Sequence, residues 1–144
     1  MSPLGAPVPG GRDRALSSPP DDAEMLVYRA DLVRARDFAA AWGRRAGLTP
    51  HRVDDLVIVV GELTANTLAH TGGPGVLRLW VTGGETVCQA EDGGQITDPR
   101  PGMRRPDPAA SGGGRGLWVV RQLCDRVEIS TGPAGTTVRV HMRL

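Results

Sequence analysis

Apolar residues recur along this chain with two different periods, and the changes of period divide it into elements. From residue 50 to about 69 they recur every three or four positions, as on one face of a helix. Two shorter stretches, 32–42 and about 115–124, have the same character. Five other segments are short and apolar or alternating, as strands are: 25–30, 76–81, 86–91, 127–130 and 136–142. The pattern predicts three helices and five strands.

Capping residues at the ends of these stretches support the two longer helices. Asp31 can cap the first helix, and Gly47 can end it. Thr49-Pro50 fits a cap followed by proline at the first helical position, and Thr71-Gly72-Gly73 ends the second helix. The buried face of the second helix is predicted to consist of Val53, Leu56, Val57, Val60, Leu63 and Thr67.

Two hairpins indicate the fold class. Gly83-Gly84 suits a tight turn between neighbouring strands, and residues 132–135 join the last two strands. We therefore predict an α+β, two-layer sandwich: a mixed, mostly antiparallel sheet of about five strands with three helices on one face. The irregular stretch 93–113, which contains four prolines, has the length of a lid or binding loop.

The first 24 residues differ in composition from the rest. They contain five of the twelve prolines and no periodicity, so residues 1–24 are predicted to be a disordered tail before one domain, 25–144. That tail is expected to be a solvated arm, although it could carry a docking segment.

Charge and cysteine content exclude several functions. The formal net charge is +1, from 17 basic and 16 acidic residues, which argues against binding nucleic acid through a large basic surface. All 17 basic residues are arginine, so mechanisms that need a lysine are excluded. Cys88 and Cys124 form no metal or redox motif and are expected to be free thiols in a reducing compartment. No stretch resembles a signal peptide or membrane span, so we expect a cytoplasmic protein.

Glu62 and Asn66 are the first candidates for chemistry. They stand four residues apart at the polar edge of the second helix, so both side chains lie on one face. A carboxylate beside a carboxamide can hold a metal ion between oxygen ligands and orient a nucleophile. The pair alone does not establish a site.

Three downstream features could complete such a site, and each also has a structural explanation. Asp92-Gly93-Gly94 could present a carboxylate to a flat ligand, or be an Asp-Gly turn. The run 112–116 could bind phosphate at a helix start, or be a flexible hinge. Thr136 could offer a hydroxyl, or be present for its strand propensity.

In this order, the segments resemble the motifs of the GHKL ATP-binding superfamily, which includes gyrase, histidine kinases, MutL and a large heat-shock chaperone. Glu62-Leu63-Thr64-Ala65-Asn66 looks like its N box and Asp92-Gly93-Gly94 like its adenine box. Gly114-Arg115-Gly116-Leu117 looks like its second glycine box, and Gly135-Thr136-Thr137-Val138 like its closing strand. In its small size and in the sequence of residues 114–120, the chain resembles one branch of this superfamily: the bacterial anti-sigma-factor serine kinases and their actinobacterial relatives. The resemblance covers about residues 25–144.

At the phosphate end, the resemblance implies roles for five residues. Asn66 would coordinate Mg²⁺ at the ATP phosphates, and Glu62 would be the general base for the attacking hydroxyl. Gly114, Arg115 and Gly116 would hold phosphate under the lid. These roles suit phosphoryl transfer, which depends on charge neutralisation and alignment.

At the base end, the resemblance implies three more roles. Asp92 would accept a hydrogen bond from the adenine amino group, Gly94 would make room for the base, and Thr136 would support adenine by hydrogen bonding. ATP and Mg²⁺ are therefore the expected cofactors.

The resemblance implies an ATP-dependent protein serine kinase that also sequesters a sigma factor and phosphorylates a serine of an antagonist protein. The expected partners are these two proteins, with a possible homodimer and with neither nucleic acid nor membrane. The segment Gln95-Ile96-Thr97-Asp98-Pro99 departs from the family, which often has another glycine there. That departure motivates an alternative, a non-catalytic protein-binding module regulated by nucleotide. The catalytic half of a histidine kinase is a weaker third possibility, because the chain lacks room for dimerising helices with a phospho-acceptor histidine.

Overall fold

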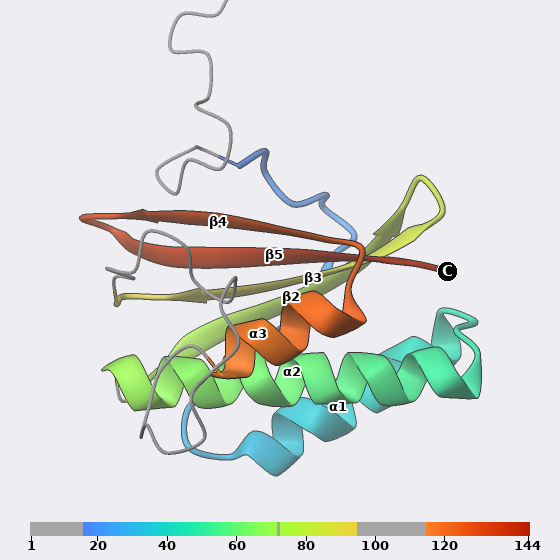
Figure 1. The fold of residues 1–144 in the computed structure, drawn as a ribbon, viewed down its shortest axis with the longest axis horizontal. Coiled ribbons are helices and arrows are strands. Elements are labelled where there is room, and N and C mark those ends of the chain that lie inside the picture. Colours follow the sequence, from blue (N-terminus) through green and yellow to red (C-terminus); the bar gives the residue numbers. More distant parts are fainter. Residues whose placement is uncertain (1–15, 72, 95–114) are drawn as a thin grey trace, which may run out of the picture.

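A computed structural model describes residues 16–71, 73–94 and 115–144 of the chain. These residues form a sheet with three helices packed against one of its faces (Figure 1). The predicted loop 93–113 lies outside the described residues from position 95 onward, and the predicted tail lies outside them up to residue 15. Both assignments stay predictions.

The sheet is antiparallel throughout its described part. Its strands are β1 (Glu24–Tyr28), β2 (Gly75–Thr82), β3 (Glu85–Asp92), β4 (Arg126–Gly132) and β5 (Gly135–Arg143). Their spatial order is β1-β2-β3-β5-β4, and every neighbouring pair is antiparallel. The crossover from β3 to β5 leaves β4 at one edge of the sheet and β1 at the other. The five strands were predicted, and this order places the end of β3 beside the start of β5.

Local sequence signals account for the turns and helix ends. In the β2–β3 hairpin Gly83 and Gly84 have φ of 54° and 76°, as a two-residue turn of this kind requires. Helix α1 (Leu32–Arg45) begins at Asp31, whose Oδ1 accepts a hydrogen bond from the Arg34 amide at 3.1 Å. Helix α2 (Pro50–Thr71) begins after Thr49, whose Oγ1 accepts one from the Arg52 amide at 3.2 Å. Helix α3 spans Arg115–Leu123.

The hydrophobic core lies between the helices and one face of the sheet. Leu77 and Leu79 of β2 point into it, as do Val138 and Val140 of β5. From α2 the hydrophobic residues and threonines that are fully or nearly fully buried are Val53, Leu56, Val59, Val60, Leu63, Thr64 and Thr67. Inclusion of Val57 in this face was wrong: Val57 is half-buried, and Val59 and Thr64 are buried instead. The buried face is wider than a narrow stripe because α2 packs against α1, α3 and the sheet.

The other face of the sheet carries polar and charged side chains together with Trp80. Residues 16–23 cross this face without regular structure apart from a turn at Asp21-Asp22 (Figure 1). All three helices lie on the opposite side, so the architecture is the predicted α+β sandwich. None of the described helices is both long and apolar enough to cross a membrane.

Candidate functional site

Helix α2 positions Glu62 and Asn66 at the margin of the core. Both side chains are half-buried, whereas Leu63 and Thr67, one position further along, are almost completely buried. Within the described residues, neither the Glu62 carboxylate nor the Asn66 amide has a hydrogen-bond or ion-pair partner. The two polar groups are therefore on one accessible edge of the helix, as their spacing predicted.

Asp92 ends β3 and is held against α2 and its own following turn. Its Oδ2 accepts a hydrogen bond from Thr67 Oγ1 at 3.1 Å, and its Oδ1 accepts one from the Gly94 amide at 2.7 Å. The Thr67 hydroxyl also lies 2.7 Å from the Tyr28 hydroxyl. Asp92 is thus oriented by α2 and by its own turn, and Tyr28 of β1 acts on it only through Thr67. A carboxylate has about four acceptor positions, so it can still receive a ligand donor.

Thr136 joins this group from the start of β5. Its Oγ1 donates to the Gly94 carbonyl at 2.7 Å and lies 2.9 Å from Thr131 Oγ1. Thr136 stands opposite Asp92 in the antiparallel pairing of β3 with β5. Gly94 itself has no room for a side chain, because a Cβ there would overlap the Thr71 methyl group. The structure therefore brings Asp92, Gly94 and Thr136 together, as expected from the sequence.

Gly116 brings the start of α3 against Glu62. A Cβ added at Gly116 would lie 3.2 Å from Glu62 Oε1, closer than side chains usually approach. From Glu62 to Thr71, α2 rises about 14 Å. This part of α2 has the start of α3 beside its Glu62 end and Gly94 beside its Thr71 end. An extended nucleoside triphosphate can span that distance. Gly114 and the side chain of Arg115, two predicted phosphate-binding groups, lie outside the described part of the chain.

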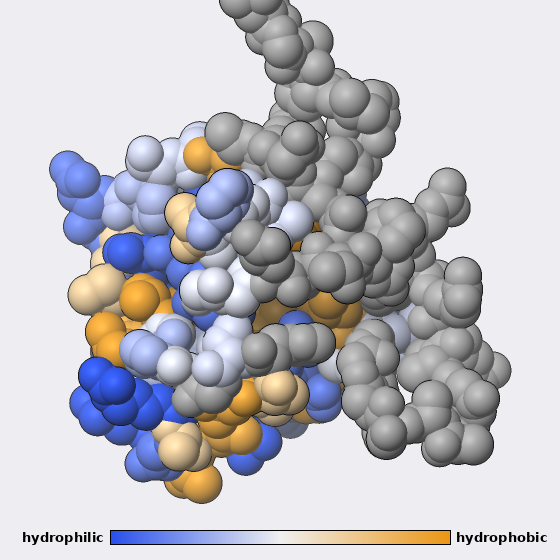
Figure 2. Space-filling model, turned by 90° about the vertical axis from the view of Figure 1, so that its left-hand side faces the viewer, coloured by the Kyte–Doolittle hydropathy of each residue, from blue (hydrophilic) through white to orange (hydrophobic). Residues whose placement is uncertain are grey.

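A cavity of about 690 Å³ lies at the same end of the molecule. It is lined by Asp92, Gly93, Gly135 and Thr136, but not by Glu62 or Asn66. Other lining residues, such as Val76, belong to the face of the sheet away from the helices. Viewed from this end, hydrophobic and hydrophilic residues are intermingled (Figure 2). Because the α2 groups lie on the helix side of Asp92, we place the candidate nucleotide site there and not in this cavity.

Burial changes the acid–base behaviour of one group beside Asp92. Removal from water raises the pKa of Tyr28 to about 12, and the negative charge of Asp92 adds to that rise, while the hydrogen bond to Thr67 opposes it. Tyr28 therefore keeps its proton at neutral pH and remains available as a hydrogen-bond donor to Thr67.

Comparison with known proteins identifies the family. Residues 28–142 match the histidine kinase-like ATPase domain. The chain belongs to that family. No curated protein matches it. Among solved structures, the chain is similar to the crystal structure of the RsbU and RsbW domains of Rv1364c from Mycobacterium tuberculosis, with a TM-score of 0.64 and 19% identity. That match covers 87% of this chain and 33% of the other, so this chain spans about a third of that structure and shares its fold.

The side chains of this histidine kinase-like ATPase domain suit a nucleotide with a magnesium ion. Glu62 and Asn66 present oxygen atoms, the ligand type that Mg²⁺ prefers. Within the described residues no group of three His, Cys, Asp or Glu could form a metal site. A magnesium ion at Asn66 would therefore take further ligands from phosphate and water, as this ion usually does.

Sequence reasoning missed several residues that shape the histidine kinase-like ATPase site. Thr67 was assigned only to the buried face of α2, yet its hydroxyl bonds Asp92. Tyr28 was assigned only to a strand, and Gly135 only to the closing-strand motif. Tyr28 bonds Thr67, and Gly135 passes so close to the Asp92 carbonyl that a Cβ would overlap it. A threonine in the middle of an apolar helical face is a signal that could have revealed the first contact. The other two depend on strand pairing.

Proposed function

We propose that this protein is an ATP-dependent protein serine kinase that also binds a sigma factor. In this proposal the γ-phosphate of ATP is transferred to a serine of an antagonist protein, and ATP binds with Mg²⁺. Family membership over residues 28–142 supports nucleotide binding. The resemblance of the motifs to anti-sigma-factor kinases supports the acceptor and the partners, and the fold shared with the RsbU and RsbW domains is compatible with them.

One observation carries the proposal: the half-buried Glu62 carboxylate lies against Gly116 at the start of α3, on the same helix edge as Asn66. A helix start presents amide N–H groups that favour phosphate. A carboxylate beside that point can accept a proton from a hydroxyl that attacks the terminal phosphate. This arrangement is suited to phosphoryl transfer and is not needed for the core, which Leu63 and Thr67 fill.

Each residue would have a separate task. Asp92 would accept a hydrogen bond from the adenine amino group, fixed in place by Thr67 and the Gly94 amide. Asn66 would contribute its amide oxygen to Mg²⁺, which neutralises phosphate charge when bound. Glu62 would orient the acceptor serine and take its proton. Gly114, Arg115 and Gly116 would contact the phosphates, and Thr136 would hold the Gly94 turn beside the base through its bond to the Gly94 carbonyl.

The kinase assay should separate chemistry from binding. The protein, Mg²⁺, radiolabelled ATP and the cognate antagonist are incubated, and Glu62→Gln is compared with wild type. Replacing the carboxylate by an amide of the same shape removes the base, so serine labelling should fall at least about 100-fold. ATP affinity, measured by calorimetry, should change less than about threefold, because the amide fills the same space.

Asp54→Asn is the matched control, since Asp54 is an exposed carboxylate on the same helix. It should label the antagonist at the wild-type rate. Tight ATP binding by the wild type without any labelling would refute the kinase and leave the non-catalytic binding module. Equal labelling by wild type and Glu62→Gln would refute the role of Glu62.

A further inference from the structure

Arg139 is a buried cation on the face of the sheet opposite the nucleotide site. Its side chain projects from β5, and the residue is only 5% exposed. The guanidinium lies over the Trp80 ring, 5.1 Å from the ring centroid, and its Nε donates to Gln89 Oε1 at 2.7 Å. Both partners are neutral. The sheet therefore holds this charge without a counter-ion at these two contacts.

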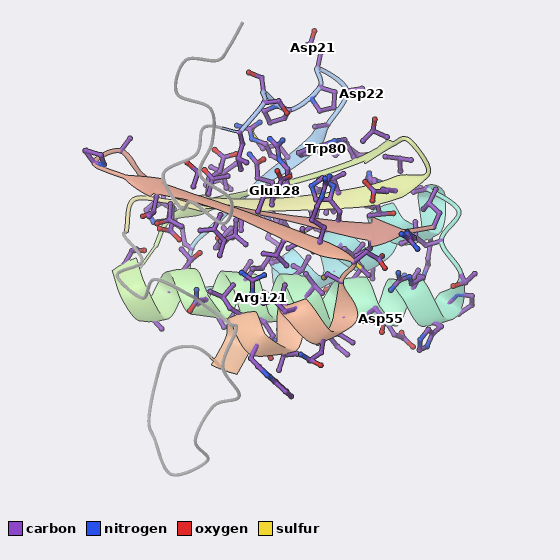
Figure 3. The ribbon with its side chains drawn as sticks, turned by 45° about the horizontal axis from the view of Figure 1, so that its top comes forward. Asp21, Asp22, Asp55, Trp80, Arg121 and Glu128 are labelled. Atoms are coloured by element: carbon purple, nitrogen blue, oxygen red, sulfur yellow. The ribbon has the colours of Figure 1, made fainter. Side chains whose placement is uncertain are left out.

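The remaining hydrogen bonds of Arg139 go to residues 16–23, which we call the N-terminal strap. Arg139 Nη1 donates to Ser17 Oγ at 2.9 Å, and Nη2 donates to the Ser17 carbonyl oxygen. Within the described residues these are the hydrogen bonds that fasten the strap to the sheet; the bond from the Ala23 amide to the Pro20 carbonyl is internal. The strap, with Asp21 and Asp22, lies on the side of the sheet from which Trp80 and Glu128 project (Figure 3).

The charge balance around Arg139 is incomplete. Among the described residues no carboxylate forms an ion pair with it. Burial lowers the pKa of Arg139, and the more distant carboxylates of Glu128 and Glu91 offset this only in part. A buried charge with neutral partners is costly, and a suitably placed anion would relieve that cost.

Space for an anion is present beside the Ser17 hydroxyl. A cavity of about 260 Å³ is lined by Ser17, Arg139, Arg78 and Glu91, among other residues. One water molecule occupies about 30 Å³ in the liquid, so a phosphoryl group fits. Arg78 is paired with Glu91 at 2.7 Å, and Glu91 also accepts a hydrogen bond from Gln89 at 2.7 Å. Two guanidinium groups and one carboxylate leave the cavity with one excess positive charge.

We propose that Arg139 is the receptor for a phosphoryl group carried on Ser17, which makes Ser17 a modification site. Ser17 is exposed and belongs to an irregular segment that few hydrogen bonds hold, so a protein kinase can reach it when the strap detaches. In the modification a bond forms between Ser17 Oγ and the γ-phosphorus of ATP, the bond to ADP breaks, and the hydroxyl proton passes to the kinase's base. The proposal is independent of the nucleotide site of this chain.

Modification would strengthen an existing contact. The neutral Ser17 hydroxyl already lies at the guanidinium, so its phosphate would form charge-assisted hydrogen bonds with the same N–H groups. The phosphorylated strap would stay on the sheet and cover Trp80 and Arg139. The unmodified strap would detach more often and expose this face.

The test uses the full chain with phosphoserine incorporated at position 17 or, as the matched control, at position 18. Ser18 is also exposed and lines the same cavity, but no hydrogen bond links it to Arg139, so it tests whether the contact with Arg139 matters beyond the cavity's charge. Phosphorus NMR across pH 4–9 would follow the second ionisation of each phosphate, which normally lies near pH 6. Hydrogen exchange with mass spectrometry would follow the amides of the strap.

Phosphoserine at position 17 should titrate at least about half a unit lower than at position 18, because a buried guanidinium favours the dianion. It should also slow strap exchange about tenfold, and phosphoserine at position 18 should not. Arg139→Gln should remove both effects; if that variant does not fold, Arg139→Lys should weaken them, because a point charge lacks the guanidinium fork. Identical titration and exchange at the two positions, or faster exchange with phosphoserine at position 17, would overturn the proposal.

Discussion

At the scale of single residues, Asp92 is the group on which nucleotide recognition is proposed to depend. Thr67 and the Gly94 amide fix the orientation of its carboxylate, which keeps acceptor positions for a ligand. Asp92→Asn should therefore weaken ATP binding about 10- to 100-fold, as expected for loss of a charge-assisted hydrogen bond. Calorimetry would measure this. Glu91→Gln is the control, because the Glu91 side chain binds Arg78 on the other face, and it should leave ATP affinity unchanged.

Tyr28 gives a pH-dependent contribution to stability. Its pKa is raised to about 12 in the folded protein from 10.0. The folded state therefore binds more protons than the unfolded state above pH 10, so the contribution is complete below pH 10 and is lost as pH rises toward 12. By pH 11 the loss is about 1.4 kcal/mol.

Tyr28→Phe isolates this contribution. At pH 8 the variant should be about 1 kcal/mol less stable to urea, because the hydrogen bond to Thr67 is lost. At pH 11 this deficit should disappear or reverse, since phenylalanine does not titrate. The buried thiols, whose pKa values are also raised, are common to both proteins and cancel. The same deficit at both pH values would contradict the assignment.

The residue types at the site could be predicted from the sequence, but their contacts could not. Asp92, Gly94 and Thr136 were selected from short motifs, and the structure brings them together. The contact between Thr67 and Asp92 joins residues 25 positions apart and depends on how α2 lies on the sheet. Helical periodicity shows which face of α2 is apolar, and it does not show which hydroxyl on that face meets a polar group on a strand.

At the scale of elements, the hairpin between β4 and β5 depends on Gly135. Its φ is +127°, and a Cβ there would overlap the Asp92 carbonyl oxygen. Gly135→Ala should destabilise the protein by at least about 2 kcal/mol, from backbone strain and from displacement of the β3 end. Gly132→Ala, in the same hairpin, meets nothing within 4 Å and should change stability by less than about 0.5 kcal/mol. Urea unfolding compares the two, and equal losses would contradict this explanation.

Element types and ends were more predictable than strand order. Asp31 and Thr49 act through hydrogen bonds to amides three residues away, so the sequence alone contains the signal. Pairing of β3 with β5 brings Asp92 opposite Thr136, although residues 95–114, α3 and β4 lie between them in the sequence. No local pattern specifies this pairing. The motif resemblance, not the periodicity, predicted that these two residues would be neighbours.

At the scale of the whole molecule, bound nucleotide should stabilise the fold. At 100 times its dissociation constant, ATP with Mg²⁺ should raise the free energy of unfolding by about 2.7 kcal/mol. Each kcal/mol of this stabilisation raises Tm by a few degrees. GTP is the matched ligand, because guanine has a carbonyl oxygen where adenine has its amino group and cannot donate to Asp92. A thermal scan should show a larger shift with ATP. Equal shifts would contradict the role of Asp92, and no shift would contradict nucleotide binding.

The interior of the sheet also protects one reactive atom. Cys88 is completely buried in β3, on the same strand face as Ala90 and Asp92, and burial raises the pKa of its thiol well above the usual range. Oxidants and alkylating agents react with thiolate, and the Cys88 thiol is both protonated and shielded from solvent. It is therefore protected from these reagents in the folded protein. Oxidation of this sulfur therefore requires β3 to separate from its neighbours. The hydrogen bonds that hold Asp92 at the end of β3 thus also protect Cys88 from oxidation.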